Sequence, residues 1–249
     1  MDPENVLEEL RKFFLQSGFN LTLTIDPVEY DNSAGIKKNL NTLFPEVKSI
    51  ILIGFGGKSF WSVFQEYLKN NPEYKSDRIN LIDDYSVLKF NEASHILNKY
   101  RVSHKSVYPF GEYALDLNFL RLGELGGAGV KSLLGILLHP VYGPWISLRG
   151  AFVTDLDLKR FNQPLTNFNP CPTCDKPCIS ACPANTISES GWDWASCMKF
   201  RLSDDTCAKS CASRRACPYG EREQYSQQQL EYHHEFVLKN VKEYFDKKA

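Results

Sequence analysis

Hydrophobic residues recur at helical and strand spacings through residues 1–160 and predict alternating helices and strands. Val6, Leu7, Leu10, Phe13 and Phe14 recur at helical spacing in a helix that begins after Asp2 and ends at Gly18. Further helices are predicted over residues 57–70, 84–100 and 115–125, and strands over residues 20–25, 49–54, 105–110, 134–138 and 145–154. Helices interleaved with strands in this order predict an α+β or three-layer α/β core around a mixed sheet.

A last amphipathic helix is predicted near the C-terminus. Ser226 and Gln229 have the spacing of a capping box, in which a side chain bonds the backbone at the start of a helix. The apolar positions that follow at helical spacing are Leu230, Val237, Val241, Tyr244 and Phe245. We expect this helix to pack back on the core.

Charge and hydropathy exclude some classes of function. The 249 residues include 29 basic and 30 acidic side chains, so the basic surplus expected of a protein that follows a phosphate backbone is missing. A nucleic-acid partner is therefore not expected. The start of the chain lacks the cationic and apolar regions of a signal peptide, and the apolar runs are too short to cross a bilayer. We therefore expect a cytoplasmic protein with no membrane partner.

Cysteine is absent from residues 1–170, and all eight cysteines fall between positions 171 and 217. Thiols stay reduced in the cytoplasm, so clustered cysteines there indicate metal binding and not disulfides. The first group is Cys171, Cys174, Cys178 and Cys182, and the second is Cys197, Cys207, Cys211 and Cys217. Proline follows both Cys182 and Cys217.

The spacing of the first group is similar to the C-x2-C-x2-C-x3-C-P run of bacterial ferredoxins, with one residue inserted in the middle gap, where Pro177 lies. The last cysteine of that run serves the other cluster of a pair. One [4Fe–4S] cluster is thus predicted on Cys171, Cys174, Cys178 and Cys217, and a second on Cys182, Cys197, Cys207 and Cys211. Structural zinc is the main alternative, although only Cys171 and Cys174 have the spacing of a zinc knuckle.

Two clusters form a path for single electrons, so a redox-active centre is expected in residues 1–160. The most informative segment there is LGILLHPVYGPWISLRGAFVTDLDL, over residues 134–158. His139 ends a predicted strand, and an aromatic-rich turn follows it, a placement that suits contact with a flat cofactor. The alternative is a strand, a turn and a strand with a hydrogen-bonded histidine.

The run from His139 to Gly150, HPVYGPWISLRG, resembles the HPxFGxWxxxRG segment of the vertebrate cobalamin-processing family MMACHC (CblC). The run EQYSQQQLEY, which begins at Glu223, is similar to another segment of that family. The same region also resembles epoxyqueuosine reductases and reductive dehalogenases, which couple a corrinoid to two [4Fe–4S] clusters. The resemblance covers residues 120–235.

This resemblance implies a nitroreductase-like fold and a corrinoid site. It places His139, Tyr142, Gly143, Trp145 and Arg149 at the cofactor, with Tyr142 as a candidate general acid by position. Glycines at positions 123, 126, 127 and 129 form either a loop that approaches a large ring or a flexible linker. The predicted organisation is a core over residues 1–165, a ferredoxin-like module with two [4Fe–4S] clusters over 166–222 and a closing helix over 223–249.

The leading hypothesis is an iron–sulfur oxidoreductase that passes electrons from a ferredoxin- or flavodoxin-type donor to cobalamin, for cobalamin processing or a cobalamin-dependent reduction. The alternatives are an FMN-dependent reductase, an electron carrier or accessory protein, and an epoxyqueuosine reductase-like enzyme of tRNA modification. A local basic set near the second cysteine group is expected to form a solvated surface or a docking face for an acidic redox partner; its members are Lys199, Arg201, Lys209, Arg214 and Arg215. His233 and His234 are expected on a surface or in the core.

Overall fold

A four-stranded sheet organises the first of the two units of the chain, seen in a computed structural model that describes residues 2–33, 35–75 and 80–246. We call Met1–Val130 with Ile146–Asn167 the sheet unit, and Lys131–Trp145 with Phe168–Ala249 the cysteine unit. The strands of the sheet are β1 (Leu21–Ile25), β2 (Ser49–Gly56), β3 (His104–Val107) and β6 (Ile146–Thr154). The helices of this unit are α1 (Pro3–Gln16), α2 (Pro27–Asp31), α3 (Leu40–Leu43), α4 (Ser59–Asn70), α5 (Leu81–Lys99) and α6 (Phe119–Gly126).

The strand order is β1-β2-β6-β3, and every pair of neighbours is antiparallel. The prediction of a mixed sheet was therefore wrong. Both β2 and β3 run opposite to β6, so they point the same way, as two strands joined through helices α4 and α5 are expected to do. The last strand in sequence, β6, lies between them and makes each pair antiparallel, an insertion that local patterning does not reveal.

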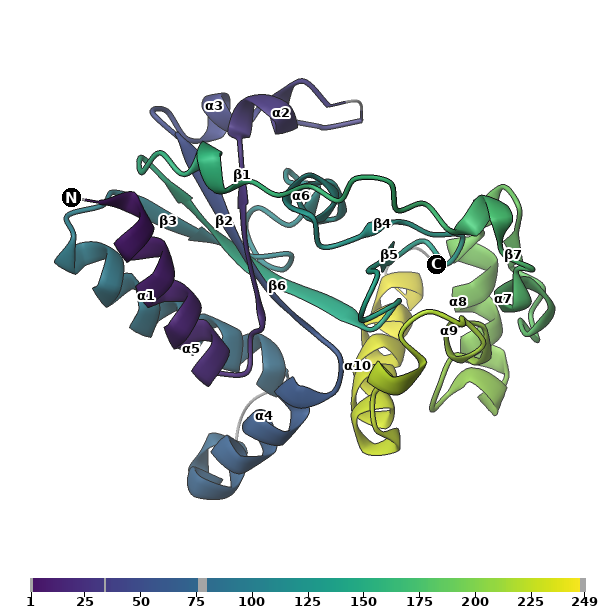
Figure 1. Cartoon of the computed structure of the whole chain (residues 1–249). Coiled ribbons are helices and arrows are strands. Elements are labelled where there is room, and N and C mark those ends of the chain that lie inside the picture. Colours follow the sequence, from purple (N-terminus) through teal and green to yellow (C-terminus); the bar gives the residue numbers. More distant parts are fainter. Residues whose placement is uncertain (1, 34, 76–79, 247–249) are drawn as a thin grey trace. The chain divides into compact units, whose positions relative to one another are not determined.

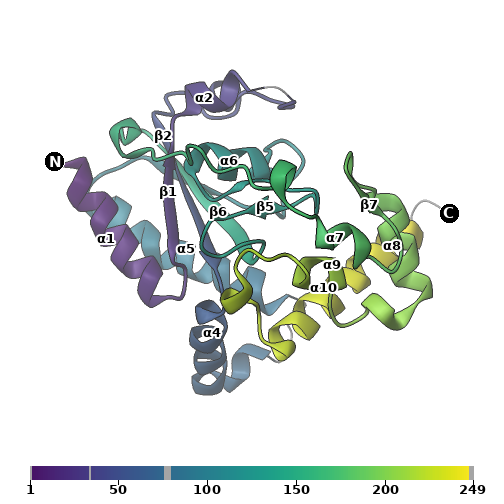
Figure 2. The ribbon, with the colours of Figure 1, turned by 45° about the vertical axis from the view of Figure 1, so that its right-hand side comes forward.

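Helices cover both faces of this sheet. On one face Phe152 of β6 lies beside Ile51 of β2 and packs against Phe14 of α1 and Phe90 of α5, with ring centroids 6.3 and 4.8 Å away. In Figure 1 the helices α1 and α5 run side by side along this face. Figure 2 shows α6 on the other side of the sheet. There the buried residues of α2, α3 and α6 pack with alternate strand residues; the core of that face contains Ile25, Tyr30, Leu40, Ile50, Leu52, Phe119, Leu122 and Val153.

Helix boundaries follow local capping chemistry. Asp2 accepts a hydrogen bond from the backbone N–H of Glu4 (3.0 Å), and Pro3 occupies the first position of α1, as the sequence predicts. The helix predicted over residues 84–100 begins earlier, at Leu81, because the side chain of Asn80 caps it by accepting from the N–H of Asp83 (3.2 Å). Asn118 caps α6 in the same way through Arg121 (3.0 Å), so this helix begins later than predicted.

The cysteine unit consists of short elements. The strands are β4 (Val130–Lys131), at whose second residue the unit begins, β5 (Leu137–Leu138), β7 (Ile187–Ser188) and β8 (Gly191–Trp192). The helices are α7 (Pro177–Ser180), α8 (Trp194–Ser203), α9 (Ala212–Arg215) and α10 (Gln227–Asp246). Of the strand predicted over residues 134–138, only the end, β5, has strand geometry.

The sequence-based division differs from the observed units in the place of residues 131–145. They were assigned to the first domain, whereas they pack within the cysteine unit. The closing helix α10 contacts α8 of the cysteine unit, and its predicted packing on the core stays a prediction. Ser226 caps the helix by accepting from the N–H of Gln229 (3.2 Å), as predicted. The side chains of the predicted stripe residues Val241, Tyr244 and Phe245 lie outside the described residues.

Among the described residues, none of the helices combines the length and the apolar character that crossing a bilayer needs.

We predict that Phe152→Ala lowers the free energy of unfolding by about 3–5 kcal/mol, because it leaves a cavity beside the two fully buried rings of Phe14 and Phe90. Leu115→Ala is the control, since that side chain is 77% exposed and its loss should change stability by less than about 0.5 kcal/mol. Denaturant unfolding followed by far-UV circular dichroism measures both. Equal effects of the two changes would contradict this account of the core.

Candidate functional site

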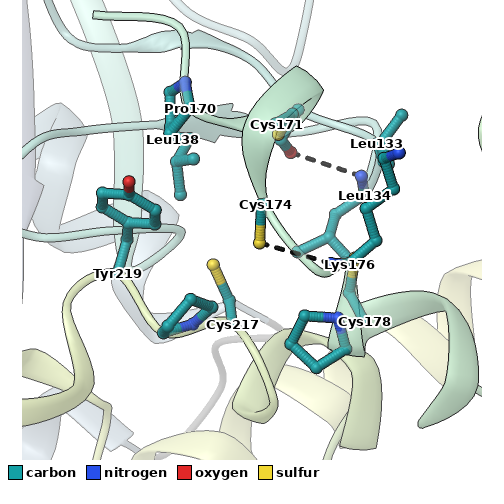
Figure 3. Close-up of a pocket in the computed structure, with 13 residues that line it drawn as sticks. Leu133, Leu134, Leu138, Pro170, Cys171, Cys174, Lys176, Cys178, Cys217 and Tyr219 are labelled. Atoms are coloured by element: carbon teal, nitrogen blue, oxygen red, sulfur yellow. Dashed lines mark hydrogen bonds between the residues drawn. The ribbon is translucent and has the colours of Figure 1, made fainter.

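Four cysteines from distant parts of the cysteine unit line one cavity, here cavity A. They are Cys171, Cys174, Cys178 and Cys217. Figure 3 shows the sulfurs of Cys174 and Cys217 directed toward the same space. The rest of the wall is mostly apolar; it includes Leu133, Leu134, Leu138, Pro170, Pro177, Pro218 and Tyr219. The structure thus brings together the four residues that ferredoxin-like exchange predicts for the first site, including Cys217 from the far end of the segment.

The other four cysteines line a second cavity, here cavity B. They are Cys182, Cys197, Cys207 and Cys211. Aromatic residues of β8 and α8 also contribute to this wall, and so do four cationic or imidazole side chains; these are Arg201, Arg214, His233 and His234. The division of the eight cysteines between the two cavities is the division that the sequence predicts.

Short local structures direct these cysteines. Cys171 begins a 3-10 turn, and Lys176 adopts a left-handed conformation (φ 53°) that lets Pro177 start α7. The inserted residue of the first group therefore falls at a turn, and Cys178 follows on α7. In the second group Cys197 lies on α8, while Cys207 ends a 3-10 turn.

Backbone N–H groups donate hydrogen bonds to cysteine sulfurs in both cavities. The backbone N–H groups of Lys176 and Thr186 donate to Cys174 Sγ and Cys182 Sγ, each at 3.4 Å. Burial acts to raise the pKa of Cys182, but the hydroxyl and N–H of Thr186 outweigh it, so the pKa is lowered overall. Hydrogen bonds of this kind stabilise a thiolate, which is the form that binds metal.

The remaining perturbed thiols have raised pKa values. Burial, followed by repulsion from Cys211 and Cys197, raises the pKa of Cys207 to about 11. Burial is also the main cause that raises the pKa of Cys178, Cys211 and Cys217. Four thiolates close together in an apolar cavity are therefore unfavourable without a cationic group between them. Metal binding would supply that group and release protons.

The donor set and its surroundings fit an iron–sulfur cluster in each cavity. Each cavity offers four soft thiolate donors in a mostly apolar wall. In cavity B the Nε–H of Arg201 is buried and has no hydrogen-bond partner within the described part of the chain. A buried donor without an acceptor costs about 1–3 kcal/mol, so it indicates an acceptor in that cavity. Across the described ranges, no three His, Cys, Asp or Glu side chains form a single-ion metal site.

The predicted cofactor segment, residues 139–145, forms a tight hairpin turn in the cysteine unit. His139 and Gly143 exchange backbone hydrogen bonds, at 2.9 and 2.8 Å. The imidazole of His139 stacks on the Tyr142 ring, with centroids 4.7 Å apart. Both side chains are partly exposed, and Val141 beside them is 60% exposed. His139 and Tyr142 are thus the members of the predicted cofactor set that still present surface to a ligand.

The hydrogen bonds of His139 restrict its chemistry. Its Nδ1 accepts from the backbone N–H groups of Val141 (3.0 Å) and Tyr142 (3.2 Å). Burial lowers the pKa of His139, so the ring is neutral at pH 7. A neutral imidazole that accepts at Nδ1 carries its proton on Nε2. His139 therefore presents an N–H donor at its free edge and not a lone pair for a metal.

Gly143 and Trp145 are covered by the rest of the cysteine unit. A Cβ on Gly143 (φ 55°) would lie 2.0 Å from the carbonyl oxygen of Tyr219, and one on Gly220 (φ 69°) would lie 2.3 Å from that of Tyr142. Trp145 is fully buried, with the Arg214 guanidinium 4.5 Å from its ring centroid. These residues join the hairpin to the segment after Cys217 and do not present surface to a ligand.

Arg149 lies in the sheet unit, on β6. Its guanidinium pairs with Asp83, and its Nε donates to Ser86 Oγ (3.2 Å). Burial raises the pKa of Asp83, although Arg149 acts in the opposite direction. The structure therefore places Arg149 in a different unit from the other four predicted cofactor residues, with an ion pair of its own.

The predicted glycine loop is mostly helical. Gly123 and Gly126 belong to α6, where Gly126 packs against Leu23 and Ile25 of β1. Gly127 ends the helix in a left-handed conformation (φ 85°), and a Cβ there would lie 2.3 Å from the carbonyl oxygen of Gln163. Close packing on β1 accounts for Gly126, and the carbonyl oxygen of Gln163 accounts for Gly127, so neither of these two glycines belongs to a flexible linker.

Arg201 and Arg214 line cavity B, although their charge had predicted a surface position. Arg201 Nη2 lies 3.0 Å from His234 Nδ1, and Arg214 donates to the carbonyl oxygen of Pro144 at 2.7 Å. Arg201 follows Cys197 by four positions on a helix, so the two share a face, a signal that could have identified it.

Comparison with known proteins shows a shared fold. No protein-family model matches the chain, and no curated protein sequence does. Among solved structures, epoxyqueuosine reductase from Bacillus subtilis is similar, with 15% identity, a TM-score of 0.63 and coverage of 91% of this chain and 68% of that one. Epoxyqueuosine reductase with an epoxyqueuosine-modified tRNA stem loop matches at 15% identity and a TM-score of 0.58, covering 93% and 69%.

A reductive dehalogenase, described with a mechanism for B12-dependent dehalogenation, matches at 18% identity and a TM-score of 0.56. The match covers 97% of this chain but 35% of that enzyme. At these identities the likeness shows the fold, and the α+β class with a cysteine-rich C-terminal part agrees with it. The nitroreductase-like and MMACHC-like assignments stay predictions.

We predict that Gly143→Ala impairs assembly of the cysteine unit, because its Cβ would overlap the Tyr219 carbonyl. The free energy of unfolding should fall by more than about 2 kcal/mol, because the backbone must move to make room for the added methyl group. Thermal melting and iron content after anaerobic purification provide the measurement. Gly191→Ala is the matched control: Gly191 also has a positive φ (118°), but nothing lies within 4 Å of a Cβ there. An equal loss in both variants would assign the effect to backbone strain alone.

We predict that His139→Asn reduces the loss of stability in mild acid. Because burial holds the pKa of His139 below its usual 6.5, the unfolded state binds more protons at that pH and below. Stability should therefore fall as the pH drops through 6.5, and it should fall less in the variant, whose amide oxygen can still accept the backbone hydrogen bonds. Melting temperatures between pH 7.5 and 5.5 measure this, with the exposed His95→Asn as control. Parallel curves for wild type and His139→Asn would refute the assignment.

Proposed function

We propose that this protein is an oxidoreductase that binds one [4Fe–4S] cluster in cavity A and one in cavity B, and that single electrons pass through them to a corrinoid. The observation that carries the proposal is the arrangement of the eight cysteines. Two cavities receive four each, and Cys182 and Cys217 are exchanged between the sequence groups as in two-cluster ferredoxins.

Each group of residues has a defined part in this function. The cysteines would hold the clusters, which supply one-electron transfer at low potential when bound. The leucines, prolines and Tyr219 around cavity A exclude water from its sulfurs. His139 would donate its Nε2–H to the cofactor or substrate. Burial, aided by the charge of Glu223, raises the pKa of Tyr142, so its hydroxyl keeps a proton that it can donate at neutral pH.

The corrinoid part of the proposal is supported by the shared fold and by the sequence resemblance at residues 139–150. Of the five residues proposed to contact it, His139 and Tyr142 have partly exposed side chains in the cysteine unit. Gly143 and Trp145 would act from behind, by fixing the hairpin. An external donor of the ferredoxin or flavodoxin type would supply the electrons.

A second candidate is reduction of a modified nucleoside in tRNA. The specific observation in its favour is that epoxyqueuosine reductases match over more than nine-tenths of this chain. The two candidates share the clusters and differ in the substrate. Binding of a tRNA anticodon stem loop by the cobalamin-loaded protein would favour the second candidate. Absence of binding at every salt concentration, low salt included, would exclude it.

Anaerobic purification followed by analysis of iron, sulfide, zinc, cobalt and flavin on one sample tests the proposal. About eight iron and eight sulfide per chain are expected. A visible-spectrum titration with cobalamin then tests the corrinoid, where a shifted spectrum at one equivalent is expected. Zinc in place of iron would refute the clusters. Bound FMN with no spectral change on adding cobalamin would replace the corrinoid by a flavin.

The grouping of the cysteines gives a sharper prediction. The double change Cys171→Ala with Cys217→Ala removes two ligands of cavity A, so iron should fall from about eight to about four per chain. The matched double change Cys171→Ala with Cys182→Ala removes one ligand from each cavity and should lower the iron content of both. Iron analysis and low-temperature electron paramagnetic resonance distinguish these results. If the Cys171→Ala, Cys182→Ala variant kept about four iron atoms and the Cys171→Ala, Cys217→Ala variant lost iron from both cavities, Cys182 and not Cys217 would serve cavity A.

A further inference from the structure

Arg201 has an unusual position for an arginine beside a cysteine site. It lies on α8, four residues after Cys197, so both side chains face cavity B. Its side chain is partly buried, and it shares the wall of cavity B with the sulfurs of Cys197, Cys207 and Cys211. Burying a cation is costly unless it meets an anion or acceptors.

One described contact orients this guanidinium. Nη2 lies 3.0 Å from Nδ1 of His234, which comes from α10. His234 is buried, and its Nδ1 also lies 3.1 Å from the carbonyl oxygen of Cys207, so α8, α10 and the Cys207 turn meet at this point. With Nη2 directed at His234, the Nε–H is left buried and without a described acceptor.

The two cavities differ in charge. Within the described residues, the wall of cavity B contains two guanidinium groups, of Arg201 and Arg214, and no carboxylate. The wall of cavity A contains one cation, Lys176, whose ammonium is already paired with Glu189 at 3.1 Å. Reduction adds one electron to the site and forms or breaks no bond. A nearby uncompensated cation favours that added charge, while burial of Cys182 and Cys207 opposes it.

We propose that Arg201 is a redox-tuning residue, which raises the reduction potential of the cavity B cluster through its positive charge and through the Nε–H directed at the cluster or its cysteine sulfurs. His234 positions it for this task. This inference rests on the proposed function, since it requires a cluster in cavity B. The reductant is a low-potential one-electron donor, for which dithionite serves in the test.

The experiment is a redox titration of the full chain followed by electron paramagnetic resonance. Arg201→Gln should lower one of the two reduction potentials by about 59 mV, which corresponds to a tenfold change in the one-electron equilibrium constant. The other reduction potential should stay unchanged. In the Cys171→Ala, Cys217→Ala background, which keeps only the cavity B cluster, the same change should shift the single remaining potential.

Three variants serve as controls. Arg215→Gln removes an identical charge from an exposed neighbour of Arg214 and should leave both potentials near their wild-type values, because solvent screens that charge. Lys176→Gln should leave the reduction potential of the cavity B cluster unchanged, because Lys176 lies in the wall of cavity A. Arg201→Lys keeps the charge but loses the planar Nε–H, so its potential should lie between those of wild type and Arg201→Gln.

Iron analysis of each variant separates the two proposals. A chain with about four or fewer iron atoms in wild type refutes the proposed function. With both clusters present, a wild-type potential in Arg201→Gln, or a shift no larger than that of Arg215→Gln, refutes the role of Arg201 and leaves the proposed function intact. If Arg201→Gln fails to retain the second cluster, Arg201→Lys provides the test. A wild-type reduction potential in Arg201→Lys also overturns the proposal.

Discussion

The backbone contact between Tyr142–Gly143 and Tyr219–Gly220 is the constraint on which the cysteine unit depends. Both glycines have positive φ and lie too close to the opposite carbonyl oxygen for any side chain. The contact joins the hairpin at residues 139–145 to the segment directly after Cys217. Because Cys217 is the cavity A cysteine farthest from the others in sequence, this contact determines whether four sulfurs or three surround the cavity.

Arg214 reinforces the same contact. Its guanidinium carbon lies 4.5 and 5.0 Å from the ring centroids of Trp145 and Tyr225, which are 5.3 Å from each other, and the group donates to the carbonyl oxygen of Pro144. Its helix, α9, begins directly after Cys211, a cysteine of cavity B. One arginine therefore links the hairpin, the second cysteine site and the start of α10. A lysine could still donate to the carbonyl oxygen, but it lacks the planar group that packs on both rings while it donates.

Local chemistry made much of this structure predictable. The cap at Asp2, the apolar run of β2 and the periodicity of α4 each identify an element from neighbouring residues alone. The division of the cysteines followed from ferredoxin-like spacing, because the ligand geometry restricts where thiolates fall in a chain. The antiparallel order was not predictable, since the insertion of β6 between β2 and β3 is a long-range event. The inward turn of Arg201 was missed because a charged residue is usually assigned to the surface.

The segment before the hairpin explains how one short stretch can serve both cavities and the proposed cofactor face. Leu134 lines cavity A and cavity B, Ile136 lines cavity B, and Leu138 lines cavity A. An apolar wall shared in this way excludes water from both sets of sulfurs, and water exclusion is one of the factors that set cluster potentials. The chain then continues directly into His139 and Tyr142. A change in this wall should therefore affect both proposed clusters at once, whereas a change at Arg201 should affect one. This difference separates the role of the shared apolar wall from the proposed role of the buried charge.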